Sequence, residues 1–411
     1  MVLNYIWIGF FVVAFILALA KLIFQNNLDI FPALVKSIFD IAEASVMDIA
    51  LPLVGVMAFW LGIMKLAEKG GAINYLSKAI APFFKRIFPE IPQNHPASGS
   101  MVMNFAANML GLDNAATPMG LKAMTFLQEL NPKKDTASNA QIMFLVLNTS
   151  GLTLIPVSIM ALRSTQGAQD PSDVFLPLLL STFFSTLGGL IVTSLIQKIN
   201  LLNKVVLVYL VGVSVLVASF IYFLSGLNSE QMEMVSKTIS NVILLGVIIL
   251  FIALASFKKI NVFESFVEGA KEGFEISVKI IPYLIALLSA IAVFRASGAL
   301  DIIVDGIRYV VLLFTDEAQF VDALPTALMR PLSGSGAKAL AIDTFNTFGI
   351  DSFAGRLAST FQGATETTFY VIAVYFGSVG IKRTRYAVSV GLFADLIGAI
   401  SAICIAYLFW A

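Results

Sequence analysis

Four long apolar stretches of this chain are interrupted by amide, hydroxyl and charged side chains. Amides and hydroxyls can hydrogen-bond an uncharged or zwitterionic solute, whereas Arg and Lys attract an anion. We expect such side chains to have a function where they lie inside a bilayer, because polar groups are costly there. The substrate-binding candidates are Asn108, Asp113, Asn114, Thr117, Asn148, Thr149, Ser150, Arg330, Ser333, Ser335, Lys338, Gln362, Thr365, Glu366, Thr367 and Thr368.

Two carboxylates are also candidates for binding a coupling ion, H⁺ or Na⁺. Glu366 lies in a polar run that opens an apolar stretch, and Asp395 lies inside another long apolar stretch. A carboxylate at membrane depth can take up a proton or a cation. The structural alternatives are ion pairs of Asp395 with Arg356 and of Arg330 with Asp343. For the amides and hydroxyls, the alternative is hydrogen bonding that holds helices together.

The composition indicates that these residues belong to a membrane protein. Of the 411 residues, 58% are hydrophobic and 13% are charged, whereas soluble proteins average about 25% charged. The 26 basic and 26 acidic residues sum to zero. This composition excludes most soluble enzymes, a disordered chain and a nucleic-acid-binding protein.

Cysteine and histidine each occur once, as Cys404 and His95. A disulfide within the chain and a thiolate or His-rich metal site are therefore excluded. His95 stands between prolines and is expected to cap a loop rather than to bind a ligand. The sequence also lacks the phosphate-binding Gly-x-x-x-x-Gly-Lys-Ser/Thr motif. We expect neither an enzyme nor a cofactor.

A helix needs about 20 apolar residues to cross a bilayer. Two apolar segments, 99–127 and 323–348, are broken in the middle by polar residues and proline, and we expect re-entrant hairpins or discontinuous helices there. The expected full spans, two of which have polar centres at 148–151 and 362–368, are 2–24, 46–64, 140–162, 174–196, 205–225, 239–257, 277–296, 357–380 and 386–410.

An internal repeat is visible in the order of these segments. Residues 31–72 and 263–299 share positions of Phe, Val, Glu and Ser, a proline near the start of the next span, and a Gly-Ala pair after it. We therefore expect two repeats, at about 1–200 and 230–411, joined by an extra span at 205–225. The predicted fold is an all-α polytopic membrane protein. Each repeat has about four spans and one broken hairpin, giving about nine full spans.

The loop charges predict that the second repeat is inverted relative to the first. Lys and Arg collect in cytoplasmic loops. Residues 65–95 contain five basic and two acidic side chains, whereas the matching 297–322 contain one basic and five acidic side chains. In two further pairs of matching loops, one loop is also richer in basic residues than its counterpart, as inversion requires. We expect the N-terminus to be cytoplasmic and the C-terminus to lie outside.

Inverted repeats with broken helices are typical of secondary transporters. We expect a secondary transporter or exchanger of a small polar solute, nucleoside-like or a small anion, with alternating access at the paired broken helices. The alternatives are a membrane scaffold or assembly factor that does not transport, and a metal-ion channel subunit. The expected partners are the solute, a coupling ion and the lipid bilayer, with no nucleic acid. A second copy of the chain, in a homodimer, is a further candidate partner.

Several motifs resemble known families. The runs at 109–124, which contains LGLDNAATPMG, and at 131–156, which contains NPKKDTASNAQ, resemble the spore maturation protein A family. The runs at 266–274, 327–337 and 355–385 resemble the spore maturation protein B family, although Asn often replaces Ser at position 335. The resemblance implies a natural fusion with an A-like part at about 1–200 and a B-like part at about 205–411.

Both families contain the nucleoside-recognition, or Gate, domain. That domain is similar to the gating segments of concentrative nucleoside transporters and of ferrous-iron transporters. The resemblance implies a multi-pass protein of the bacterial inner membrane, and in spore formers it implies a link to dehydration of the spore core. It suggests nucleosides as solutes only by analogy between folds.

Overall fold

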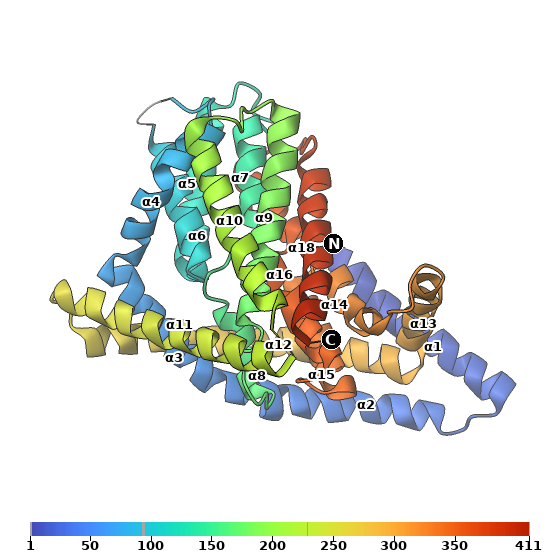
Figure 1. Cartoon of the computed structure of the whole chain (residues 1–411). Helices are drawn as coiled ribbons and strands as arrows, with labels where there is room; N and C mark the ends of the chain where they lie inside the picture. Colours follow the sequence, from blue (N-terminus) through green and yellow to red (C-terminus); the bar gives the residue numbers. More distant parts are fainter. Residues whose placement is uncertain (1, 93–94, 228, 411) are drawn as a thin grey trace. The chain divides into compact units, whose positions relative to one another are not determined.

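The computed structural model describes residues 2–92, 95–227 and 229–410, and every regular element in that part of the chain is a helix (Figure 1). The all-α fold expected from the sequence is confirmed. The helices of the first half are α1 (Val2–Gln25), α2 (Ile30–Ala44), the π-helical η1 (Ser45–Ala50), α3 (Leu51–Gly70), α4 (Ala72–Ile87), α5 (Pro96–Met109), α6 (Asp113–Leu130), α7 (Asn139–Ser150), α8 (Val157–Thr165) and α9 (Phe175–Gln197).

The second half follows α10 (Lys204–Ser225) and has a similar succession of long, short and paired helices. Its elements are α11 (Ser229–Phe257), α12 (Val262–Ala296), α13 (Ala299–Leu312), the 3₁₀ turn η2 (Gln319–Ala323), α14 (Leu324–Met329), α15 (Gly334–Phe348), α16 (Phe353–Ala364), α17 (Thr368–Ser378) and α18 (Ala387–Trp410). The two short amphipathic helices α4 and α13 each follow a glycine, Gly71 and Gly298, with a φ of +82°.

Fewer helices are long enough to cross a membrane than the sequence predicts. Six helical stretches of the described residues, one of them the run from α2 through η1 to α3, have the necessary length and apolar composition, or up to seven candidates if the bent pair Leu284–Ala296 and Ala299–Leu312 forms one span. Two of the nine expected spans, 140–162 and 357–380, are each divided into two short helices. The first divides at Gly151 and Pro156 and the second divides at 365–367. Hydropathy averages over a window, so it does not detect such a break.

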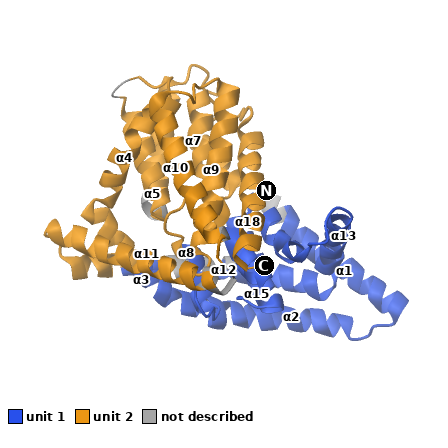
Figure 2. Cartoon of the chain, in the orientation of Figure 1, with its two compact units in different colours: residues 1–60, 158–171, 270–362 blue, residues 61–157, 172–269, 363–411 orange. Residues whose placement is uncertain are grey.

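Contacts divide the chain into two compact units (Figure 2). Each unit contains segments from both halves of the sequence, and each divided span has one helix in each unit. Thus α7 and α17 belong to unit 2, whereas nearly all of α8 and α16 belongs to unit 1. Unit 1 comprises Met1–Trp60, Ser158–Pro171 and Ala270–Gln362, and unit 2 comprises Leu61–Val157, Ser172–Gly269 and Gly363–Ala411.

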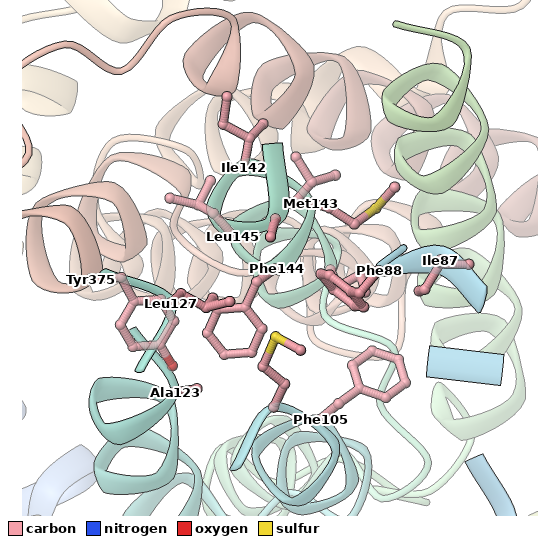
Figure 3. Packing of buried hydrophobic residues seen from close by; sticks show 14 of the residues in the cluster. Ile87, Phe88, Phe105, Ala123, Leu127, Ile142, Met143, Phe144, Leu145 and Tyr375 are labelled. Carbon is pink, nitrogen blue, oxygen red and sulfur yellow. The ribbon is translucent and has the colours of Figure 1, made fainter. Parts of the chain in front are cut away.

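The core of unit 2 holds the α5–α6 hairpin against α7 and α17 (Figure 3). Phe105 of α5 and Leu127 of α6 are buried in the same cluster as Phe144 of α7 and Tyr375 of α17. The rings of Phe144 and Tyr375 stack with centroids 5.7 Å apart. Such aromatic pairs contribute about 0.5–1.5 kcal/mol beyond the area they bury. The core therefore fixes the position of the hairpin relative to both short helices.

Glycines allow α9 and α18 to approach closely in unit 2. A Cβ on Gly189 would lie 3.2 Å from the Cβ of Ala394, and one on Gly188 would lie 3.1 Å from Ile397. The Ser185 hydroxyl donates a 2.9 Å hydrogen bond to the Ala394 carbonyl oxygen across the same contact. Small residues with bridging hydroxyls are the usual packing of helices in membranes.

Unit 1 has its own, smaller core. The Trp7 indole N–H of α1 donates a 2.8 Å hydrogen bond to the Ala286 carbonyl oxygen of α12, and Phe10 stacks on Phe294. These contacts tie the first helix of the chain to a helix more than half the sequence away. The apolar cluster beside them consists of Ala14, Ala18, Ile30, Leu34 and Val293.

Candidate functional site

The α5–α6 hairpin turns at a glycine in unit 2. Gly111 has a φ of +70°, and a Cβ there would lie 2.6 Å from the Ile155 carbonyl oxygen. Glycine suits this position because it tolerates the left-handed conformation and adds no side chain. The Met109 carbonyl oxygen also accepts a 2.7 Å hydrogen bond from the Leu154 N–H. The tip of the hairpin is therefore fixed to the chain between α7 and α8.

The breaks of the two divided spans cross each other in unit 2. Gly151 ends α7 in the left-handed conformation, with a φ of +57°. The carbonyl oxygen of Thr149, in the last turn of α7, accepts a 2.8 Å hydrogen bond from the Glu366 N–H just before α17. A Cβ on Gly151 would lie 3.3 Å from the Glu366 Cγ. A backbone N–H of the second break thus pairs with a carbonyl oxygen at the end of α7, in the other half of the chain.

A chain of amide and phenol groups runs beside this crossing. Asn148 Oδ1 accepts hydrogen bonds from Asn108 Nδ2 at 2.7 Å and from the Tyr375 hydroxyl at 3.3 Å. Asn104 Nδ2 donates to the Tyr375 oxygen at 3.2 Å and to the Ala116 carbonyl oxygen at 2.8 Å. The structure therefore connects the hairpin, α7 and α17 through uncharged polar groups.

Asn104 and Tyr375 are not among the residues predicted from the sequence. Asn104 stands four positions before Asn108 in α5, so both side chains lie on one helix face. That spacing could have identified Asn104. Tyr375 lies in the apolar helix α17 and offers no such signal. Gly120 makes room for it, because a Cβ there would lie 2.3 Å from the Tyr375 hydroxyl oxygen.

A second polar group in unit 2 contains a buried carboxylate. The Thr368 hydroxyl donates a 2.6 Å hydrogen bond to Asp395 Oδ2, and Asp395 is 7% exposed. Thr368 begins α17 and Asp395 lies within α18. Gly391 permits the contact, since a Cβ there would lie 2.8 Å from Thr368 Cγ2 and 3.7 Å from Thr149 Cγ2. The acid therefore lies beside the helix breaks.

The remaining candidates of unit 2 differ in exposure. Ser150, Thr365 and Thr367 are buried, whereas the side chains of Glu366 and Thr117 are exposed. The Ser150 carbonyl oxygen accepts from the Thr186 hydroxyl at 3.5 Å. The side chains of two predicted site residues, Asp113 and Asn114, lie outside the described residues.

In unit 1 the turn between α14 and α15 gathers three of the candidates. Ser333 caps α15, and its Oγ accepts a 3.0 Å hydrogen bond from the Gly336 N–H. The Ser335 Oγ lies 3.3 Å from the Ser333 Oγ, and Gln362 Nε2 donates a 3.3 Å hydrogen bond to the Gly334 carbonyl oxygen. These contacts hold the second hairpin against the end of α16.

Two cationic candidates lie near this turn in sequence. Arg330 is 9% exposed and Lys338 is half-buried. Asp343, the acid suggested as a partner for Arg330, is bound by Arg295, whose Nε lies 2.7 Å from both carboxylate oxygens. Arg295 lies at the end of α12, and the sequence gives no sign that it faces α15.

A fully buried arginine that the sequence reasoning missed anchors α8 in unit 1. Arg163 Nη1 donates hydrogen bonds to the Ile350 carbonyl oxygen at 3.0 Å and to the Ser359 hydroxyl at 3.1 Å, and its Nη2 lies 3.0 Å from Asp351 Oδ1. The Gln169 N–H donates to the other Asp351 oxygen at 3.0 Å. The end of α8 is therefore bound to the loop that precedes α16.

A related contact in unit 2 binds the end of α17 to the loop before α7. The Asp135 carbonyl oxygen accepts from the N–H groups of Lys382 and Arg383, each at 2.9 Å. The Ala137 carbonyl oxygen accepts from Arg385 Nη1 at 3.0 Å. In both units, basic residues in or just after the last turn of the second helix of one divided span bind the loop before the first helix of the other.

His95 caps the helix α5, whereas the sequence predicts that it caps a loop. It precedes α5, and its Nδ1 accepts a 3.2 Å hydrogen bond from the Ala97 N–H. In the described part of the chain, no group of three or more His, Cys, Asp or Glu side chains is placed to hold a metal ion.

Ion pairs join α3 to the start of α12 within unit 2. Lys69 donates hydrogen bonds to Glu268 and, at 3.4 Å, to Ser265, and Lys65 lies 3.5 Å from Glu268. The hydrogen bond from Lys69 lowers the pKa of Glu268, and the charges of Lys69 and Lys65 act in the same direction against partial desolvation. This carboxylate lies before the apolar part of α12.

Comparisons with known proteins agree with the motifs. The chain is 46% identical to spore maturation protein B of Bacillus subtilis over 179 residues, which is 44% of this chain and 94% of that protein. It is 36% identical to spore maturation protein A of the same organism over 189 residues, 46% of this chain and 92% of that protein. No solved structure matches the chain. The family model for the nucleoside-recognition domain matches residues 50–166 and 277–382. The chain therefore belongs to the Gate, or nucleoside-recognition, family, and it joins regions similar to both spore maturation proteins.

Proposed function

We propose that this protein is a secondary transporter or exchanger of a small polar solute, with alternating access at its two divided spans. The observation that supports it most strongly is the crossing of the two helix breaks at Thr149 and Glu366 in unit 2. Crossed breaks leave backbone groups and short helix ends at membrane depth, where a solute can bind. A static bundle would gain stability from continuous helices instead.

The solute that fits the unit 2 site is uncharged or zwitterionic. The groups beside the crossing are the amides of Asn104, Asn108 and Asn148 and the phenol of Tyr375. Amides and phenols offer both donors and acceptors, as a nucleoside-like solute requires. A small anion is the second class, because the candidates of unit 1 include Arg330 and Lys338.

Two inverted repeats are part of the proposal. The succession of helices is the same before and after α10 if α2, η1 and α3 together correspond to α12. The Arg163 contact and the Arg385 contact correspond to each other in the two repeats, since each joins the first half of the sequence to the second. The basic residues of 65–95 then lie in the cytoplasm of a bacterial cell. The N-terminus is cytoplasmic and the C-terminus is outside, in an inner-membrane protein.

Asp395 is the proposed site of the coupling ion. It is a buried acid in a membrane helix, and Thr368 ties it to the first turn of α17, next to the break. Binding of H⁺ or Na⁺ at Asp395 neutralises the carboxylate beside the first turn of α17. Ion binding and movement of the helix break are therefore linked. Glu366 is the second carboxylate beside the break, and its exposed side chain is able to meet an ion or a solute from water.

The decisive experiment is a thermal-stability screen of the purified protein against nucleosides, nucleobases, amino acids and small dicarboxylates. A solute at 100 times its Kd stabilises the folded state by about 2.7 kcal/mol. A solute that binds should then exchange across proteoliposomes, and Asn148→Ala should abolish the exchange. A binder that never exchanges would contradict transport and favour a scaffold.

Cysteine accessibility tests alternating access directly. Cys404 is the one native cysteine and is exposed, so it is first replaced by alanine. Asn148→Cys and Thr365→Cys are then treated with small thiol reagents from each side of the membrane. We expect the reactivity of each to depend on the side and on the bound solute. If both stay unreactive in every condition, the alternating cavity does not exist.

A further inference from the structure

A groove of about 860 Å³ runs between α4 and the first turns of α5 in unit 2. Its accessible apolar wall is formed by Ala81, Ile91 and Met103, which are exposed or half-buried, and Lys78, Lys85 and His95 contribute basic side chains. The described residues that line it include no Asp or Glu. The groove therefore combines an apolar wall with a net positive charge.

The two lysines form one cationic edge. Lys78 and Lys85 are seven residues apart on α4, which places them two turns apart on the same face. Both are exposed, and neither forms a salt bridge in the part of the chain that the structure describes. Lys65 and Lys69 of α3, in contrast, pair with Glu268. The positive charge of the groove is thus not neutralised by the described carboxylates of the protein.

His95 adds a hydrogen-bond donor at the other side of the groove. Its Nδ1 accepts from the Ala97 N–H, so the neutral ring carries its proton on Nε2. The helix α5 begins at Pro96, which also lines the groove, and the N-terminal end of a helix dipole favours an anion. The polar part of the groove is therefore suited to a phosphate group.

We propose that this groove binds an anionic phospholipid. The phosphate of the headgroup contacts Lys78, Lys85 and His95, and an acyl chain lies along Ala81, Ile91 and Met103. The charge complementarity selects an anion, and the apolar wall selects one with a hydrocarbon chain. Basic grooves among membrane helices bind lipid headgroups in this way, and amphipathic helices such as α4 lie in the membrane interface. This proposal does not depend on transport.

The test measures the thermal stability of the full-length protein in neutral detergent while lipid is added. Dioleoyl phosphatidylglycerol is compared with dioleoyl phosphatidylcholine, which has the same acyl chains and no net charge. Of the two lipids, we expect only the phosphatidylglycerol to raise the apparent Tm. The variant Lys78→Gln/Lys85→Gln should need a roughly 25-fold higher concentration of the anionic lipid for the same Tm shift. Each lysine near a headgroup contributes a factor of about five to the affinity.

Matched variants separate the groove from general surface charge. Lys133→Gln/Lys204→Gln removes the same charge from exposed lysines of unit 2 that do not line the groove, and it should respond like the wild type. Lys78→Arg/Lys85→Arg keeps the charge and should keep the response. The proposal is overturned if the Lys133/Lys204 pair loses as much affinity as the groove pair. It is also overturned if phosphatidylcholine stabilises equally well.

A soluble anion is the remaining occupant to distinguish. Inorganic phosphate and glycerol 1-phosphate carry the headgroup chemistry without the acyl chain. We expect neither to raise the Tm at concentrations where the lipid saturates. If inorganic phosphate reproduces the full shift and Lys78→Gln/Lys85→Gln removes it, the site is one for soluble phosphate and the lipid assignment is wrong.

Discussion

The N–H of Glu366 donates a hydrogen bond of 2.8 Å to the carbonyl oxygen of Thr149, although the two residues lie in opposite halves of the chain. Thr149 lies in the last turn of α7 and Glu366 lies just before α17, and each of these helices is one part of a span that the chain divides between its two compact units. This contact satisfies one backbone N–H of the second break with one carbonyl oxygen at the end of α7, and so helps to stabilise non-helical backbone in an otherwise apolar protein.

Asn148→Ala should destabilise the protein and abolish solute binding. The substitution removes the acceptor of both Asn108 and Tyr375, and a buried polar group left without its partner costs about 1–3 kcal/mol. Thermal unfolding and the solute screen measure the two effects. Asn241→Ala is the control, since Asn241 is exposed and bonds to the Lys237 carbonyl oxygen one turn before it. Equal effects of both substitutions would contradict a special role for Asn148.

Asp395→Asn should separate ion coupling from solute exchange. The amide oxygen can still accept the hydrogen bond from Thr368, so the fold should persist, but the group can no longer take up a proton or neutralise a cation. We expect solute exchange to continue in proteoliposomes while uphill uptake driven by a pH or Na⁺ gradient stops. Asp316→Asn, at an exposed position after α13, should leave both unchanged. Normal gradient-driven uptake by Asp395→Asn would exclude Asp395 as the coupling site.

Gly111→Ala should be strongly destabilising. The left-handed backbone costs an alanine about 1–2 kcal/mol, and the new Cβ would also meet the Ile155 carbonyl oxygen. Gly377→Ala is the matched change, because Gly377 lies in α17 with open space around its Cβ position, and alanine there should stabilise by about 0.5–1 kcal/mol. The measurement is the difference in Tm. A Gly111→Ala protein as stable as the wild type would show that the hairpin turn is not fixed.

Arg163→Ala should destabilise the protein far more than Arg383→Ala. Arg163 is fully buried and pairs with Asp351, and removing one partner of a buried ion pair costs about 3–5 kcal/mol. The Arg383 side chain is 76% exposed and lies 3.6 Å from Asp135, so its loss should cost at most about 1 kcal/mol. Chemical or thermal unfolding measures the loss of stability of each variant. Similar losses for the two variants would mean that burial does not determine the strength of these contacts.

The contact between Glu268 and Lys69 should make stability depend on pH. The pKa of Glu268 is lowered in the folded state, so its contribution is complete above the ordinary value of 4.5 and is lost as the pH falls through the lowered pKa. The Tm of the wild type should therefore exceed that of Glu268→Gln at about pH 6, and the gap should close towards about pH 3. A gap that stays constant with pH would show that the Glu268 charge does not contribute.

The local composition of the sequence determined much of this protein. Hydropathy identified the apolar helices, because burial in lipid requires about 20 apolar residues whatever lies beside them. Glycine, proline and polar runs located the breaks within 99–127 and 323–348, because these residues end helices by their own backbone chemistry. The motifs at 109–124 and 355–385 identified the family.

The tertiary structure decided which of these local features meet. It divided the spans expected at 140–162 and 357–380, since averaging over a window conceals a few polar residues. It also placed Tyr375 against Asn148 and Arg295 against Asp343. No pattern along the chain predicts such pairs. Their geometry depends on packing between helices that are distant in sequence, and a helix sequence records which face is buried but not which partner buries it.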